Sequence, residues 1–214
     1  MASLGPTALR TKSAIMESAL RLWKERGFDS VTVDDITGAA GVAKGSFYTY
    51  FSTKSDIIVE EFKKIDAYYA DFARRRLGRY ATARAKLSAF TRAQMRYVRD
   101  EIGCDSLKVL YANQTSQPGG DKILTNGDRH WVRIVEAIIA EGQASGEFRA
   151  DLGAERLAGF FNRSARAVFL DWCIGDASFD LVKEGVFFME RWAAASLSPP
   201  GAEEGRSFQG GAGE

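Results

Sequence analysis

The chain has 214 residues, of which 45% are hydrophobic and 27% are charged, and its 29 Lys and Arg residues nearly balance 28 Asp and Glu residues. This composition is that of an ordinary globular protein, long enough for one or two domains. A formal net charge of +1 excludes a globally basic coat for nucleic acid. Any contact with DNA must therefore come from Lys and Arg side chains placed locally.

Cysteine content and hydropathy indicate in which cellular compartment the protein is expected. The two cysteines, Cys104 and Cys173, lie 69 positions apart and make neither a disulfide framework nor a CxxC metal clip. Residues 1–22 carry charged side chains and lack the apolar block of a secretory signal, and no segment approaches the roughly 20 apolar residues of a membrane span. The sequence predicts a soluble cytoplasmic protein without a membrane partner.

Proline occurs at only four positions, Pro6, Pro118, Pro199 and Pro200, and apolar residues recur at spacings of three and four. Both features predict an all-α chain with long helices. In chain order, the predicted helices cover residues 11–26, 33–39, 43–50, 55–76, 82–100, 105–113, 122–145, 154–174 and 178–196. Residues 1–8 are expected to form a loose arm, and residues 197–214, rich in proline and glycine, a disordered tail.

Two helix starts carry a capping-box sequence, in which a hydroxyl and a carboxylate three residues apart satisfy each other's backbone N–H groups. These boxes are Thr32 to Asp35 and Thr53 to Asp56. They frame residues 32–51, TVDDITGAAGVAKGSFYTYF, which divide into two short helices joined by a tight turn at Gly41. The spacing is typical of a helix-turn-helix.

Apolar residues of this segment each have a packing role, because Val33, Ile36 and Ala40 face inward from the first helix and Phe47 anchors the second. Val42 fills the corner. The remaining residues are predicted to face a DNA major groove or its phosphates, through Lys and Ser side chains, a close glycine backbone, tyrosine hydroxyls and helix starts. The predicted DNA-binding residues are Thr32, Lys44, Gly45, Ser46, Tyr48, Tyr50 and Lys54.

From about residue 11 to residue 58, the sequence resembles the TetR family of bacterial transcriptional regulators. The resemblance rests on residues in the family's order and spacing: Ala19, Leu22, Gly27, Phe28, Thr32, Val33, Ile36, Ala40, Gly41, Val42, Phe47, Tyr48, Tyr50, Phe51, Lys54 and Ile57 or Ile58. Thr37 departs from the family's usual alanine. The resemblance implies an all-α homodimer with a DNA-binding domain at 1–54 and an effector-binding and dimerisation domain at 55–196.

The C-terminal half is rich in aromatic residues on predicted helices, with a few polar side chains among them. A core and an effector pocket use the same residue types, so the sequence leaves both interpretations open. The candidate effector residues are Phe90, Gln94, Tyr97, Tyr111, Trp131, Asn162, Arg166 and Phe169. The helices at 154–174 and 178–196 carry more apolar surface than one packed face needs, which favours a twofold dimer.

Other function classes lack their residues. His130 is the only histidine, and no base-orienting motif, metal-ligand spacing or nucleotide fingerprint accompanies it. The sequence therefore predicts no enzyme, no metal and no cofactor. It predicts a homodimeric repressor that leaves a palindromic operator when a small apolar or amphipathic organic effector binds. Activation, control by a partner protein, or a helical ligand-binding protein without an operator remain as alternatives.

Overall fold

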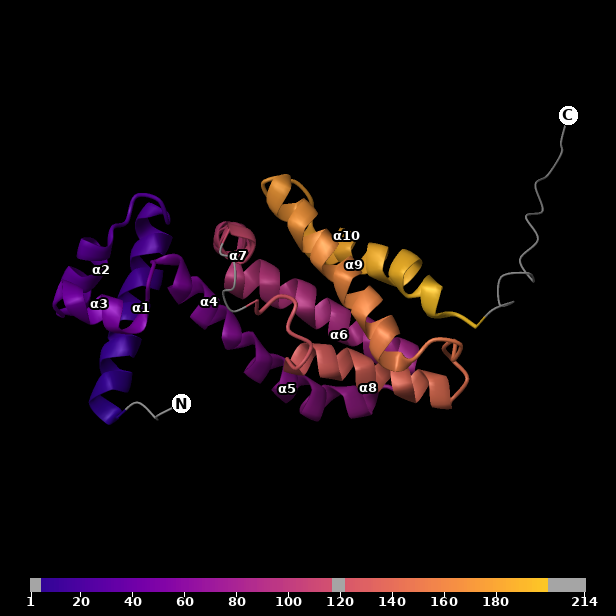
Figure 1. Ribbon diagram of the computed structural model, residues 1–214. Helices are drawn as coiled ribbons and strands as arrows, with labels where there is room; N and C mark the ends of the chain where they lie inside the picture. Colours follow the sequence, from indigo (N-terminus) through magenta and orange to yellow (C-terminus); the bar gives the residue numbers. More distant parts are fainter. Residues whose placement is uncertain (1–4, 117–121, 200–214) are drawn as a thin grey trace, which may run out of the picture. The chain divides into compact units, whose positions relative to one another are not determined.

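The computed structural model describes residues 5–116 and 122–199, and within that part every regular element is a helix and none is a strand (Figure 1). The prediction of an all-α fold is confirmed. The helices are α1 Pro6–Arg26, α2 Val33–Ala40, α3 Lys44–Tyr50, α4 Ser55–Lys63, α5 Ile65–Arg76, α6 Ala83–Tyr97, α7 Cys104–Ser116, α8 His130–Ala144, α9 Ala154–Ile174 and α10 Leu181–Phe188. Five-residue π-helical turns extend α6 over Val98–Ile102 and α10 over Met189–Ala193.

The first helix begins earlier than predicted. Pro6 occupies the first turn of α1, so residues 6–8 are helical and do not form a loose arm. Proline suits this position because its missing N–H has no intrahelical partner there and its φ is already helical. The sequence prediction treated Pro6 only as a helix breaker.

Two of the predicted helices differ from the structure. The single helix predicted over residues 55–76 is interrupted at Lys64, which separates α4 from α5. The helix predicted from residue 122 begins only at His130, because the backbone N–H groups of Thr125 and Asn126 both bond to the Lys122 carbonyl in a turn. Gly127 follows this turn.

The chain divides into two compact units, each built from two segments. The helix-turn-helix unit comprises Met1–Ile65 and Asp100–Asn126, and the second unit comprises Asp66–Arg99 and Gly127–Glu214. Leu197, the first residue of the predicted tail, is buried in the second unit, and its carbonyl accepts a hydrogen bond from the Arg149 backbone N–H at 2.8 Å. Residues 200–214 lie outside the described residues. The functional boundary after residue 54 stays a prediction.

The helix-turn-helix unit has its own apolar core. Ile15 and Ala19 of α1, Ile36 of α2 and Phe47 of α3 are fully buried, and Ile57 of α4 packs against the same cluster. Helix α7 packs on α4, where the buried Asn113 side chain donates to the Ser55 hydroxyl at 3.0 Å. The two short helices α2 and α3 thus pack on α1, which also contacts α4, and α4 in turn packs on α7.

In the second unit, α8 packs against α6 and α9, and α10 packs against α6 and α9. Small residues allow the close approaches. A Cβ at Gly142 of α8 would lie 2.1 Å from the Phe148 ring, and one at Gly185 of α10 would lie 2.9 Å from the Met95 sulfur. Among the described helices, none combines the length and the apolar character that a membrane crossing requires.

Candidate functional site

The turn between α2 and α3 is fixed by backbone geometry and one cap. The Thr32 hydroxyl accepts from the Asp35 N–H at 3.1 Å, and the Asp35 carboxylate accepts from the Thr32 N–H at 2.8 Å, so the first predicted capping box is confirmed. The Thr32 hydroxyl also donates to the Asp35 carboxylate, and this bond, together with the one from the Thr32 N–H, lowers the pKa of Asp35. Gly41 has a φ of 67°, a left-handed conformation that favours glycine, and it ends α2.

The second predicted capping box forms only in part. The Asp56 carboxylate accepts from the Ser52 and Thr53 N–H groups, each at 2.9 Å. The Thr53 hydroxyl, however, lies 2.9 Å from the Ser55 hydroxyl and caps no N–H group of α4. The prediction of a reciprocal box was wrong for the hydroxyl, because Lys54 already has helical backbone angles and moves the start of α4.

Helix α3 presents a polar, solvent-exposed side beyond its buried anchor Phe47. Tyr48 is 55% exposed, Lys44 and Gly45 are exposed, and Ser46 and Tyr50 are half-buried. A Cβ at Gly45 would meet nothing within 4 Å inside the chain. Nothing within the unit therefore requires glycine there, whereas a close external surface would.

The Lys44 ammonium donates to the Asp34 carboxylate at 2.9 Å, across the turn from α3 to α2. That hydrogen bond and the nearby negative charge raise the pKa of Lys44, which is charged at neutral pH in any case. Both side chains are more than half exposed, so the ion pair is weak and exchangeable. Lys44 is available to a phosphate that competes with Asp34.

Lys54 has a different environment from the one that its sequence position suggested. Its ammonium donates to the Phe28 and Val31 carbonyls at 2.7 and 3.0 Å and lies 4.2 Å from the centre of the Phe28 ring. Two of its three N–H donors thus hold the loop after α1. A phosphate contact by Lys54 would use the remaining donor.

The structure separates the eight candidate effector residues. Tyr111 lies on α7 in the helix-turn-helix unit, whereas the other seven lie in the second unit. Phe90, Gln94, Trp131 and Asn162 are buried there, and the others are half-buried: Tyr97, Arg166 and Phe169. Ring contacts connect part of this set, because Tyr69 lies 5.2 Å from Phe90 and 6.1 Å from Tyr97 between ring centres.

Three of these buried residues carry polar atoms without a hydrogen-bond partner among the described residues. They are the Gln94 side-chain oxygen, the Trp131 indole N–H and both polar atoms of the Asn162 amide. Leaving such a group unpaired in a protein interior costs about 1–3 kcal/mol each. Native structures rarely retain these costs without a water, ion or ligand that satisfies the groups.

The packing of the helices places two of these groups at one level. Lys86 of α6 donates to Glu141 of α8 at 2.7 Å, which fixes the antiparallel register of the two helices. Gln94 lies about 12 Å further along α6 than Lys86, close to the start of α8, where Trp131 is located. Asn162 comes from α9, which also packs against α8.

A buried ion pair that the sequence prediction missed lies beside this region. The Arg129 guanidinium, 6% exposed, donates to Asp66 Oδ2 at 2.8 Å. Asp66 Oδ1 is buried and has no hydrogen-bond partner among the described residues. Burial also raises the pKa of the neighbouring Tyr69 phenol well above its ordinary value. Asp66 and Arg129 are 63 positions apart, so no local pattern in the sequence indicated that they pair.

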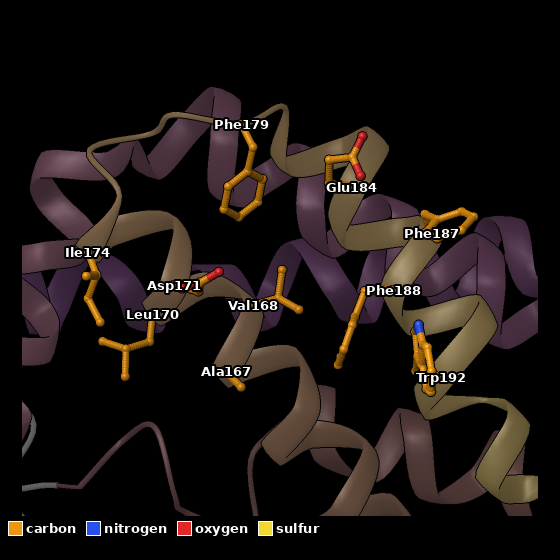
Figure 2. Close-up of a pocket in the computed structure, with 10 residues that line it drawn as sticks. All are labelled: Ala167, Val168, Leu170, Asp171, Ile174, Phe179, Glu184, Phe187, Phe188 and Trp192. Carbon is orange, nitrogen blue, oxygen red and sulfur yellow. The ribbon is translucent and has the colours of Figure 1, made fainter.

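A second feature is an open apolar groove of about 770 Å³ along α9 and α10. Figure 2 shows the rings of Phe179 and Phe188 pointing into the space between the two helices, with Trp192 beyond Phe188. Ile174 and Trp192 are 72% and 70% exposed. Asp171 and Glu184 are the only charged residues that line the groove, so the rest of this face is apolar.

Comparison with known proteins identifies relatives of both units. Residues 15–60 match the family described as bacterial regulatory proteins, tetR family. The chain is 31% identical over 165 residues to the transcriptional regulator AcuR of Cereibacter sphaeroides, a match that covers 73% of each chain. It is 25% identical over 170 residues to the fatty acid metabolism regulator protein of Bacillus subtilis, covering 78% of this chain and 86% of that protein.

The fold is similar to that of Thermus thermophilus FadR, a TetR family transcriptional repressor whose structure holds lauroyl-CoA. The TM-score is 0.70 at 20% identity, and the match covers 86% of this chain and 93% of FadR. The likeness extends over both compact units and is therefore not confined to the helix-turn-helix.

Proposed function

The chain belongs to the TetR family of bacterial transcriptional regulators, and from this premise we propose that it is a cytoplasmic repressor released from DNA by an amphipathic organic effector. The observation that carries the DNA-binding part is the exposed side of α3, where Lys44 and Tyr48 project from a helix anchored by buried Phe47. A helix of this kind fits the major groove of DNA. The proposed role involves no catalysis.

Within this proposal, Lys44 exchanges its Asp34 partner for a phosphate or a guanine edge, and Tyr48 donates its hydroxyl to the DNA backbone. Gly45 lets the duplex approach the α3 backbone, because no side chain occupies the open space there. Thr32, at the start of α2, and Lys54 contact phosphates. Ser46 contacts a base edge or a phosphate, and the Tyr50 hydroxyl contacts a phosphate. Phosphate contacts make such binding strongly dependent on salt.

Fluorescence anisotropy with DNA from upstream of the chain's own gene, at two salt concentrations, tests this role. We expect Lys44→Ala to weaken binding by roughly tenfold and to reduce its salt dependence. Asp34→Asn, which releases the Lys44 ammonium and removes a negative charge, should tighten binding. Lys183→Ala, at an exposed position of the second unit, is the control and should bind as the parent does. Equal binding to scrambled DNA would contradict operator recognition.

The effector part of the proposal rests on the unpaired polar atoms of Gln94, Trp131 and Asn162. An effector that enters between α6, α8 and α9 supplies the missing partners and gains hydrogen bonds in an apolar surrounding. The rings of Phe90 and Tyr97 supply apolar contact, and the lauroyl-CoA complex of FadR supports an amphipathic ligand. Arg166, Phe169 and Tyr111 carry no comparable observation.

Asn162→Leu should separate stability from effector response. Replacing an unsatisfied buried amide by an apolar group of similar size is neutral or stabilising, so we expect the free energy of unfolding to stay equal or rise by roughly 1 kcal/mol. The lauroyl-CoA concentration needed for half-release of operator DNA should rise about tenfold. Urea denaturation and anisotropy measure the two quantities.

Gln143→Leu is the matched control, because this amide is satisfied by the Arg149 and Leu152 carbonyls, both at 2.8 Å. It should lower the free energy of unfolding by about 1–2 kcal/mol and leave the release concentration unchanged. The effector site would be elsewhere if Asn162→Leu destabilised the chain and left release unaffected.

The assembly that we propose is a homodimer formed through the groove on α9 and α10. An apolar face with Ile174 and Trp192 mostly exposed is costly in water, and a twofold copy of the same face covers it. The two recognition helices of such a dimer read the half-sites of a palindromic operator.

A further inference from the structure

The second unit has another groove, of about 650 Å³, between α5 and α6. On α6 its lining residues Ala85, Ser88 and Ala89 are small and recur at three and four positions, which leaves the floor low. On α5 it is walled by Tyr68 and Phe72. The Tyr68 ring lies 4.4 Å from Tyr97, and the Phe72 ring lies 6.2 Å from Phe90, so the wall continues into the aromatic core.

Four arginines also line this groove, Arg75 and Arg76 from α5 and Arg92 and Arg96 from α6. The only lining carboxylate, Asp71, pairs with Arg75 at 2.7 Å, and Arg92 lies 3.7 Å from Glu190. Arg76 and Arg96 have no hydrogen bond or ion pair among the described residues. In a chain of formal net charge +1, this concentration of guanidinium groups is local.

We propose that this groove binds the phosphorylated nucleoside end of an acyl-thioester effector of the coenzyme A type. Guanidinium groups bind phosphates through paired charge-assisted hydrogen bonds, and a tyrosine ring offers a purine a stacking surface. The volume suits a ligand of this size, whereas a lone phosphate would fill a small part of it. The inference rests on the proposed function, because this ligand is the proposed effector.

Placement along α6 connects this groove to the core. Arg92 and Arg96 line the groove, while Gln94, between them in the sequence, is buried on another face of the same helix. The groove wall itself reaches the interior, because Tyr68 contacts Tyr97 and Phe72 lies near Phe90. The phosphates of the proposed ligand remain in the groove, and its acyl part reaches the aromatic core.

Isothermal titration calorimetry of the full chain without DNA tests the proposal with three probes: lauroyl-CoA, free coenzyme A and lauric acid. In Arg76→Gln/Arg96→Gln, the Kd for lauroyl-CoA should rise about tenfold to a hundredfold, with a similar loss for coenzyme A and none for lauric acid. The control, Arg79→Gln/Lys183→Gln, removes the same charge from exposed residues outside the groove and should stay within about twofold of the parent.

Unchanged lauroyl-CoA affinity in Arg76→Gln/Arg96→Gln would overturn the proposal, as would an equal loss for lauric acid or no binding of lauroyl-CoA by the parent chain. Competition by inorganic phosphate at the same concentration as coenzyme A would also overturn it, because it would reduce the groove to a general anion site. Operator titration is a separate readout. A chain that binds lauroyl-CoA through the arginines but no operator would leave this site intact and refute the repressor role.

Discussion

Trp192→Glu is expected to convert the protein from a dimer into a monomer and to weaken operator binding by about a hundredfold or more. Trp192 is 70% exposed in the single chain, so the substitution leaves the fold of each protomer intact. In the proposed dimer, the same residue is covered by the partner's apolar face, where a carboxylate loses its hydration without gaining a cation. A monomer reads one half-site and loses the benefit of linked recognition helices.

Light scattering coupled to size-exclusion chromatography measures the first effect. The parent should have twice the chain mass of 23.5 kDa, and Trp192→Glu should have the chain mass itself. Leu9→Glu places the same charge at an exposed apolar residue of the helix-turn-helix unit and should remain dimeric. A dimeric Trp192→Glu variant would mean that the protein assembles through a different face.

Phe47→Ala should cost about 3–5 kcal/mol in the free energy of unfolding, the largest stability loss that we predict. Phe47 is fully buried among Ile15, Ala19 and Ile36, and it is the anchor by which α3 packs on the rest of its unit. Its removal leaves a cavity at the point where α1, α2 and α3 meet. Thermal denaturation followed by circular dichroism should show the loss as a lower Tm.

The neighbouring residue supplies the control. Tyr48 is 55% exposed and touches the core only through the edge of the Phe47 ring, so Tyr48→Ala should change the free energy of unfolding by less than about 0.5 kcal/mol and still weaken DNA binding. The two adjacent residues therefore distinguish an effect on stability, at Phe47, from an effect on DNA binding, at Tyr48. A loss of stability in Tyr48→Ala equal to that of Phe47→Ala would show that Tyr48 packs against its own chain instead of facing DNA.

What the sequence predicted well depends on local spacing. The Thr32 cap and the left-handed Gly41 follow from contacts within a few residues, which capping rules describe. The burial of Ile36 and Phe47 follows from the spacing of apolar residues along their own helices. The same local rules placed Gln94 and Asn162 on apolar helix faces. They could not indicate that these amides lack partners, because that depends on which helices surround them.

What the sequence did not predict depends on distant partners. Lys54 binds carbonyls 26 and 23 residues earlier in the chain, and Arg129 pairs with a carboxylate 63 residues earlier. The predicted helix over 122–129 failed for a related reason. The Gln114 side chain accepts from the Leu124 N–H at 3.3 Å, and the Gln114 carbonyl accepts from the Lys122 ammonium, so tertiary bonds hold this segment in turns. Helix propensity describes a residue in isolation and does not include hydrogen bonds to distant parts of the chain.

Because the helix-turn-helix unit draws α7 from a later part of the chain, it cannot be exchanged as one continuous piece. A fragment that stops at residue 54 lacks α4, with the buried Ile57, and lacks the Asn113 bond that joins α7 to α4. A hybrid regulator made by joining residues 1–54 to a foreign effector domain would lack both helices, and the core of its helix-turn-helix would lose the packing of Ile57. A junction placed directly after the helix-turn-helix, at residue 54, therefore divides a folded unit.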